Sequence, residues 1–180
     1  MSQPESPRAA SPPETEFVFA REVDAPRDLV FTLWTDPGHL KHWFMPKGYS
    51  GRIAKLDFRP GGTYHYCLQG PDAPEMWGKW EFREIVAPER LVFVNAFSDE
   101  AGGLTRHPLA PDWPLRMMTT VTFTERAGRT TLTVRWAPIS PSEAEARAFE
   151  AGRASMQQGW TGTMEMLAEY LKSLGAGRAS

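Results

Sequence analysis

Cysteine, excess positive charge and long apolar runs are all scarce in this chain of 180 residues. A single cysteine, Cys67, cannot form an intramolecular disulfide, so we expect a reducing compartment, the cytoplasm. The 20 basic and 22 acidic residues give a formal net charge of −2, which argues against a nucleic-acid partner, because such proteins usually carry a basic face. No apolar run approaches the roughly 18 residues of a membrane span, and the mean hydropathy is −0.43.

The two ends of the chain contain little that a core would bury. Residues 1–15 (MSQPESPRAASPPET) have neither the basic start nor the apolar stretch of a signal peptide, and their composition predicts a disordered tail. Residues 175–180 are typical of a frayed end. We therefore expect one domain over residues 16–174, a length that suits a single hydrophobic core.

Apolar and polar residues alternate in most of the chain, which is the period of half-buried strands. Turn residues separate these segments, for example Pro60-Gly61-Gly62 and Ala127-Gly128. Strands joined by tight turns predict an antiparallel sheet with one apolar face. The expected strands cover residues 16–23, 52–58, 63–68, 79–83, 91–97, 117–123 and 132–136. In the second of these, Ile53 falls on one face and Leu56 with Phe58 on the other.

Helical patterns follow the first strand and end the chain. Asp24 and Asp36, each close to a proline, predict the starts of two short helices. Ser140-Pro141-Ser142-Glu143 predicts a capped helix that runs to about residue 174. Its apolar stripe must be buried against the sheet, so we expect an α+β fold in which a curved antiparallel sheet of about seven strands encloses a long C-terminal helix. The stripe consists of Phe149, Met156, Trp160, Met164, Leu167, Leu171 and Leu174.

This order of elements, with five local strings, resembles the SRPBCC (START/Bet v/polyketide cyclase-like) superfamily and its helix-grip fold. More narrowly, it resembles the branch homologous to the C-terminal domain of the activator of heat-shock protein 90 ATPase. The resemblance implies a cavity between sheet and helix for an apolar or amphipathic small molecule, although the superfamily also includes enzymes and a co-chaperone domain. The strings are WTDPGHLKHWF (34–44), RPGGTYHY (59–66), GKWEFREIVAPERLVF (78–93), TTLTVRW (130–136) and SMQQGWTGTMEMLAEYL (155–171).

Large inward side chains are the candidate lining of that cavity. Most inward aromatics simply form core, but a domain of this size rarely fills its core with so many rings and methionines. Gly152 and Gly159 flank the helix stripe and fit either close packing or a cavity wall. The candidate lining residues are Phe58, Tyr64, Tyr66, Trp80, Phe82, Phe93, Asn95, Val121, Phe123, Trp136, Met156, Trp160 and Met164.

The segment of residues 98–114 (SDEAGGLTRHPLAPDWP) is longer than a hairpin requires. Its apolar residues among glycine and proline suit a lid over a pocket, or an ordered surface loop anchored by Trp113. The lid candidates are Leu104, His107, Leu109 and Trp113.

Residues for catalysis or metal binding do not form a convincing pattern. His39 and His42 lie three residues apart on a short helix without a third ligand, which is typical of surface histidines. Cys67 lies beside His65, but a free cysteine is most often a small buried hydrophobe. Asn95 is the one polar residue of an apolar strand, where it either bonds a ligand carbonyl or lies at the strand end.

These patterns favour a non-enzymatic protein that binds an apolar or aromatic small molecule, lipid-like or polyketide-like, without a cofactor or a metal. Two alternatives stay open: a protein-binding module, by analogy with the co-chaperone domain, and a cyclase or hydrolase that uses a pocket acid or base. The activator's N-terminal domain has no counterpart here, so chaperone binding is unproven. An exposed sheet edge also allows a homodimer.

Overall fold

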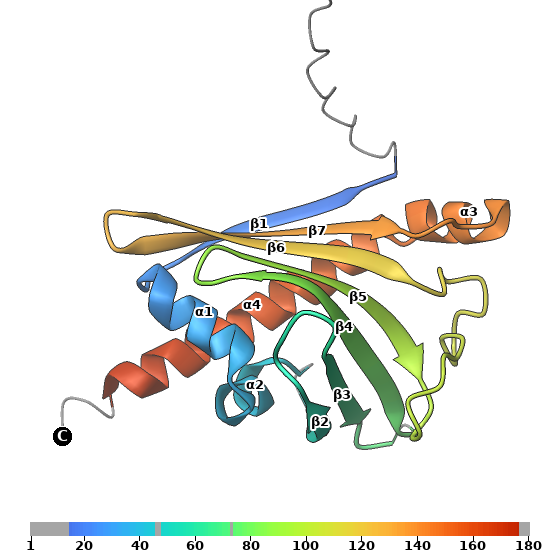
Figure 1. The fold of residues 1–180 in the computed structure, drawn as a ribbon, viewed down its shortest axis with the longest axis horizontal. Helices are drawn as coiled ribbons and strands as arrows, with labels where there is room; N and C mark the ends of the chain where they lie inside the picture. The colour runs from blue at the N-terminus through green and yellow to red at the C-terminus, as the bar shows by residue number, and fades with distance from the viewer. Residues whose placement is uncertain (1–14, 46–47, 73, 177–180) are drawn as a thin grey trace, which may run out of the picture.

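A computed structural model describes residues 15–45, 48–72 and 74–176. The described residues form seven strands and four helices in the expected order, except that two helices replace the single C-terminal helix (Figure 1). They are β1 (Phe17–Val23), α1 (Arg27–Thr35), α2 (Pro37–Trp43), β2 (Ser50–Leu56), β3 (Thr63–Gln69), β4 (Met76–Val86), β5 (Arg90–Ser98), β6 (Met117–Arg126), β7 (Arg129–Pro138), α3 (Glu143–Ala151) and α4 (Arg153–Ala176).

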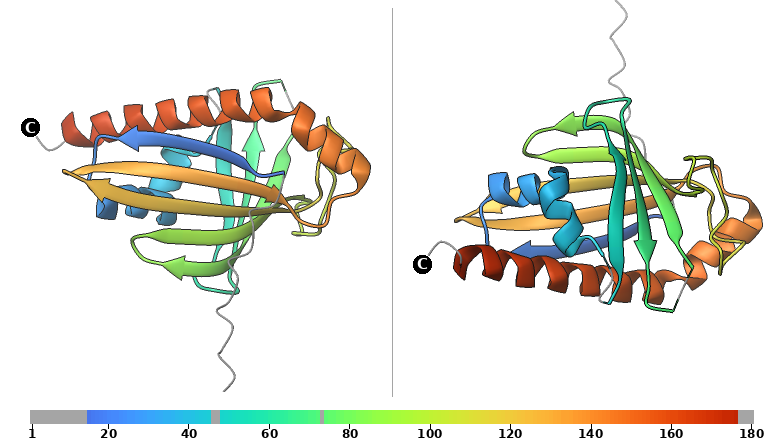
Figure 2. Two further views of the ribbon diagram at one scale, coloured as in Figure 1. Left: turned by 90° about the horizontal axis from the view of Figure 1, so that it is seen from above. Right: turned by 90° about the horizontal axis from the view of Figure 1, so that it is seen from below.

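The strands form one antiparallel sheet in the order β1-β7-β6-β5-β4-β3-β2. Figure 2 shows that the sheet curves and that α4 lies along its concave side. The predicted α+β helix-grip fold is therefore confirmed. The expected tail of residues 1–15 falls, apart from Thr15, outside the described residues, as does the C-terminal end beyond α4.

The two short helices begin where the sequence predicts, but only one is capped as expected. Asp36 caps α2, because its side chain accepts a hydrogen bond of 2.6 Å from the backbone N–H of Gly38. Asp24 does not cap α1, whose N-cap is Pro26. The backbone N–H of Arg27 instead donates to Glu125 Oε2 at 2.8 Å. A carboxylate from the distant β6 thus replaces the local cap, and local sequence gives no sign of that.

The prediction of one continuous C-terminal helix is wrong, because the helix is interrupted at Gly152. Helix α3 ends at Ala151 with Gly152 as its C-cap, and the chain changes direction before α4 (Figure 2). A Cβ at Gly152 would lie 2.8 Å from the ring of Trp113, so only glycine lets that ring approach. The cap is also shifted: the capping box forms between Ser142 and Glu145, two residues later than predicted, and Ser140 has a φ of 46°.

The predicted alternation of β2 is also wrong. The register between β2 and β3 shifts between Ile53 and Lys55, as a β-bulge does. The extra residue in β2 shifts the alternation by one position, so the side chains of Ile53 and Leu56 lie on the same face. Both pack against the core, as does Phe58.

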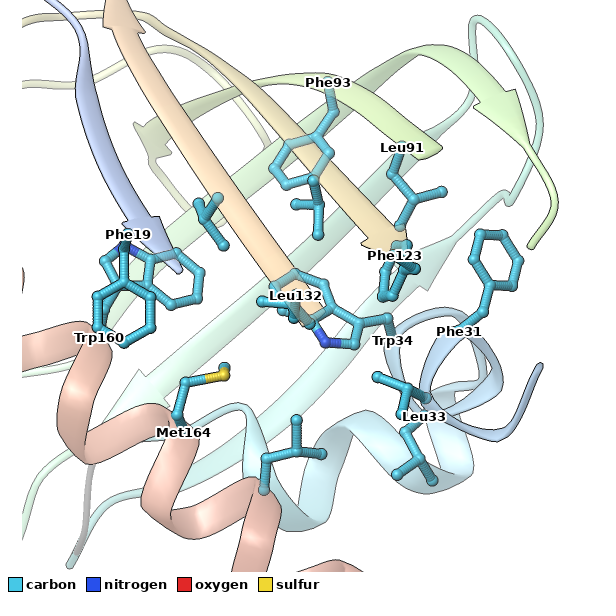
Figure 3. Close-up of a cluster of buried hydrophobic side chains, with 14 of the residues drawn as sticks. Phe19, Phe31, Leu33, Trp34, Leu91, Phe93, Phe123, Leu132, Trp160 and Met164 are labelled. Atoms are coloured by element: carbon cyan, nitrogen blue, oxygen red, sulfur yellow. The ribbon is translucent and has the colours of Figure 1, made fainter. Parts of the chain in front are cut away.

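The core lies between the concave face of the sheet and the three helices α1, α2 and α4. The backbone of α4 approaches β1 and α2, whereas large side chains span the distance to the central strands. Figure 3 shows Trp34 reaching from α1, and Trp160 and Met164 from α4, into one cluster with Phe93 and Leu132. Rings therefore connect the helices to the middle of the sheet.

Two glycines of the C-terminal helices have opposite surroundings, which gives a matched pair of alanine substitutions. Gly152→Ala places its methyl group against Trp113 and is expected to lower the free energy of unfolding by about 1–3 kcal/mol. Gly159 is exposed with no atom within 4 Å of an added Cβ, so Gly159→Ala is expected to raise it by about 0.5–1 kcal/mol. Urea unfolding measures both, and equal effects would contradict the assigned packing.

Candidate functional site

The interior between the concave face and α4 contains the side chains expected to line a pocket. Nine of them are buried: Tyr64, Trp80, Phe82, Phe93, Val121, Phe123, Met156, Trp160 and Met164. Phe58, Tyr66 and Trp136 are partly buried against this cluster. Sheet register explains the shared face, because Tyr64 pairs with Trp80, and Phe82 with Phe93.

Trp34 lies at the centre of this interior, although the sequence marks it only as part of the apolar face of α1. Its ring is 6.1 Å from that of Trp160, with an angle of 11° between the planes. The rings of Trp80 and Phe123 are 6.4 and 6.0 Å away. The spacing of Trp34 with Val30 on a helix predicts burial, but only the fold shows that the ring joins α4 to the sheet.

Two indole N–H groups in this interior have no hydrogen-bond partner among the described residues: Trp34 Nε1 and Trp160 Nε1. Both side chains are buried, with 1% and 6% of their surface exposed. The neighbouring Trp43 differs, since its Nε1 donates to the backbone carbonyl of Leu33 at 2.9 Å. An unpaired buried donor costs about 1–3 kcal/mol, so these two donors stand out on the inner side of the sheet.

Two tyrosines add hydroxyl groups to the same face. Burial raises the pKa of Tyr64 well above its usual value and raises the pKa of Tyr66 to about 12. Both phenols therefore stay protonated at neutral pH. The interior thus presents protonated O–H and N–H groups rather than bases.

Asn95 lies within β5 and not at its end, which corrects the alternative that placed it there. It pairs with Trp80 on one side and Met117 on the other. Its Oδ1 accepts a hydrogen bond of 2.5 Å from the hydroxyl of Thr119 on β6. The amide is half-buried on the concave face.

The lid candidates of the segment between β5 and β6 separate into exposed and packed residues. Leu104 and Leu109 are 46% and 87% exposed. The ring of Trp113 packs on Phe149 at 5.9 Å, and that of His107 on Phe97 at 4.5 Å. Burial lowers the pKa of His107. Trp113 thus anchors the segment to α3, as the alternative of an ordered surface loop expects.

The polar face of β3 and β4 is turned away from this interior, as the sequence predicts. His65 Nε2 donates to the carbonyl of Asp99 at 3.2 Å, and Glu81 forms ion pairs with Lys79 and Arg83 at 3.2 and 3.3 Å. The turn that starts at Asp99 therefore covers this outer face. Burial raises the pKa of the thiol of Cys67.

The histidines of α2 contact Tyr170 of the last helix. His39 Nδ1 is 2.8 Å from the hydroxyl of Tyr170, and the ring of His42 stacks on the Tyr170 ring with centroids 5.0 Å apart. In residues 15–45, 48–72 and 74–176, no group of three or more His, Cys, Asp or Glu side chains could hold a metal ion.

Two hollows lie outside the interior. The first, of about 230 Å³, lies where β4 begins and β5 ends, beside residues 105–108. The second, of about 310 Å³, is a wide, shallow depression lined by Arg27, Glu89, Arg90, Thr122, Phe123 and Thr124. Charged side chains that line the second hollow form ion pairs with one another; for example, the guanidinium of Arg27 lies 3.4 Å from the carboxylate of Glu89.

The model of one protein family, Activator of Hsp90 ATPase homolog 1-like protein, matches residues 24–172. The chain belongs to this family. The match includes both short helices, β2 to β7 and most of α4, so it contains every element that builds the interior except β1. No curated protein sequence is similar enough to the chain to count as a match.

Solved structures of other proteins share the fold of this family member. A protein from Arthrobacter aurescens is 26% identical over 88% of this chain and 87% of its own, with a TM-score of 0.73. Protein Ms6760 from Mycobacterium smegmatis is 24% identical over 87% and 90%, with a TM-score of 0.71. DynU16, from the dynemicin biosynthetic locus, is 22% identical over 89% of this chain but only 48% of its own, with a TM-score of 0.61.

None of the helices in the part of the chain that the structure describes is long and apolar enough to cross a membrane.

Two buried tryptophans allow the unpaired indole groups to be tested by stability. Trp34→Phe and Trp43→Phe remove similar buried ring area, but only the second removes a hydrogen bond. We expect Trp43→Phe to lower the free energy of unfolding by about 1–2 kcal/mol more than Trp34→Phe. Chemical unfolding checks this, and an equal loss would mean that Trp34 Nε1 is already paired.

A buried carboxylate at the start of α3 predicts a pH dependence. Hydrogen bonds from the backbone of Ser142 and from Arg106 lower the pKa of Glu145 below its ordinary 4.5. The folded state therefore favours the charged carboxylate, and this stability is present above pH 4.5 and lost as the pH falls through the lowered pKa.

Glu145→Gln is accordingly expected to cost about 0.5–1 kcal/mol at pH 7, since Arg106 is half exposed and solvent weakens the ion pair. The difference from the wild type should shrink steadily below pH 4.5 in urea unfolding. A difference that stays constant down to pH 2 would assign the effect to packing rather than to charge.

Proposed function

We propose that this protein binds an uncharged apolar or aromatic small molecule between the concave face of the sheet and α4. The observation that carries this proposal is the pair of buried, unpaired indole N–H groups of Trp34 and Trp160. Cores rarely retain unpaired donors, because each costs about 1–3 kcal/mol. Acceptor atoms of a bound molecule would remove that cost.

The polar groups of the interior define the chemistry of the ligand. Indole N–H groups donate and do not accept, and the raised pKa values keep the phenols of Tyr64 and Tyr66 protonated. The buried Asp, Glu, Lys, Arg and His residues among those described are His65, on the outer face, and Glu145, at the start of α3. A ligand with a net charge would therefore be buried without a partner. Ring-bearing compounds with carbonyl groups, such as polyketide-like molecules, fit best.

Flexible side chains support accommodation of a ligand in a core that is tightly filled with rings. Met117, Met156 and Met164 are all buried at the interior. Methionine has unbranched, polarizable side chains that repack at low cost. Rearrangement of these residues would make room beside the rings of Trp34 and Trp160 without breaking a hydrogen bond.

The comparisons agree with this proposal without deciding it. The family and its neighbours share the fold, and one neighbour, DynU16, comes from a biosynthetic locus. Since fold alone does not fix function, the proposal depends on the interior of this chain.

A ligand panel tests the proposed function. We expect ring-bearing carbonyl compounds, represented by flavonoids and anthraquinones, to raise the unfolding midpoint, because they bind only the folded state, while fatty acids and sterols act less. Trp34→Phe or Trp160→Phe should weaken the binding of the best ligand about three- to tenfold, the worth of one hydrogen bond.

Trp43→Phe is the matched control, because its indole N–H already has a partner. It should leave ligand affinity unchanged even though it lowers stability. No midpoint shift across the whole panel, or equal loss of affinity in all three variants, would refute the proposal.

A further inference from the structure

A hollow at the ends of β4 and β5 lies outside the interior, and both apolar and polar residues line it. It has a volume of about 230 Å³ and is open to solvent on one side. Its lining residues lie where β4 begins and β5 ends, and Figure 1 shows that these strand ends are next to the segment that leads to β6. Its walls consist of Glu75, Met76, Trp77, Phe97, Ser98, Thr105, Arg106 and Pro108.

Ser98 supplies the polar anchor of this hollow. Only 6% of the residue is exposed, and its Oγ has no hydrogen-bond partner among the described residues. Sheet register pairs Ser98 with Trp77 across β4 and β5, so hydroxyl and indole lie side by side on one face. A hydroxyl both donates and accepts, so a hydroxyl or a carbonyl on a ligand satisfies it.

The walls of the hollow are held in place before anything binds. The guanidinium of Arg52 lies 4.7 Å from the centre of the Trp77 ring, and the His65 ring lies 4.8 Å from it. On the opposite wall, the backbone N–H of Thr105 donates to the carbonyl of Phe97 at 3.1 Å. Preorganised walls reduce the entropy lost on binding.

Charges at the rim are already paired within the protein. Arg52 pairs with Glu75 at 3.2 Å, and Arg106 pairs with Glu145 and donates to the carbonyl of Trp113 at 3.3 Å. A charged ligand would have to compete with these pairs, whereas an uncharged one leaves them intact. The apolar contacts come from Met76, Trp77, Phe97 and Pro108.

We infer that this hollow is a second binding site, for a small uncharged aromatic molecule that carries one hydroxyl or carbonyl group. A dry cavity of about 150 Å³ holds benzene, so the hollow has room for one substituted ring. The ring packs against Trp77, and its oxygen bonds to Ser98 Oγ on the same face of the sheet. This assignment is independent of the function proposed for the interior.

A titration of the 15N-labelled full chain with p-cresol tests the inference by NMR. We expect amide shifts at Trp77, Ser98 and Thr105, with a dissociation constant on the order of 1–10 mM for so small a ligand. Toluene, which lacks the hydroxyl, should bind about three- to tenfold more weakly. Benzoate and benzylammonium should bind more weakly still.

Two substitutions assign the contacts. Ser98→Ala should weaken p-cresol about three- to tenfold and leave toluene unchanged, and it should fold, since it removes an unpaired hydroxyl. Trp77→Leu should weaken both ligands. Ser155→Ala, an exposed residue of α4 outside the hollow, is the matched control and should change neither.

Each other outcome overturns the inference. Unchanged p-cresol affinity in Ser98→Ala, or no saturable shifts at Trp77, Ser98 and Thr105, excludes the site. Shifts that gather instead at Trp34 and Trp160 assign the ligand to the interior, which supports the proposed function while it refutes this second site.

Discussion

The fold depends on filling the distance between one helix and the middle of a single curved sheet. The backbone of α4 approaches the sheet most closely along the edge strand β1, so large side chains must span the remaining width. Trp160 of α4 meets Trp136 of β7 at 5.5 Å, and Trp34 of α1 completes the connection toward Trp80. Stability in this family member therefore comes from rings that pack as a cluster, where each contributes both buried area and directional contact.

That requirement explains why indole donors remain in a core that cannot satisfy them. Backbone groups within the sheet and the helices bond mostly to one another, so the acceptors near an inward indole are few. Trp43, the last residue of α2, finds a partner because its indole reaches the carbonyl of Leu33 in the last turn of α1, where carbonyls have no partner within the helix. The side chains of Trp34 on α1 and Trp160 on α4 extend into the interior, and their N–H groups have no partner among the described residues. The central position that lets the rings of Trp34 and Trp160 pack on several elements also keeps their indole N–H groups away from acceptors.

Strand faces could be predicted from the sequence because they depend only on alternation, and alternation survives wherever strands pair without interruption. The inward placement of Tyr64 and Trp80, and the outward placement of His65, follow in this way. The prediction failed where tertiary contacts decided the geometry. Gly152 ends a helix because the distant Trp113 packs against it, and a bulge near Ile53 resets the face of β2. Neither the contact between Gly152 and Trp113 nor the bulge in β2 can be predicted from the local sequence pattern.

The candidate site shows the same division. Most of its rings were predictable as inward residues, whereas the central role of Trp34 requires knowing that α1 lies under the sheet beside α4. The covering of the outer face was equally hidden, because the turn from Asp99 reaches back over His65 on β3. This fold-back moves residues 105–108 to the ends of β4 and β5 and creates the hollow beside Trp77. One loop thus closes part of the outer face and opens a pocket at its margin. The polar groups differ accordingly: the interior offers indole N–H donors and protonated phenols, whereas the hollow offers the hydroxyl of Ser98. A ligand carbonyl can accept a hydrogen bond from an indole N–H and from the Ser98 hydroxyl, whereas a ligand hydroxyl can in addition donate to Ser98.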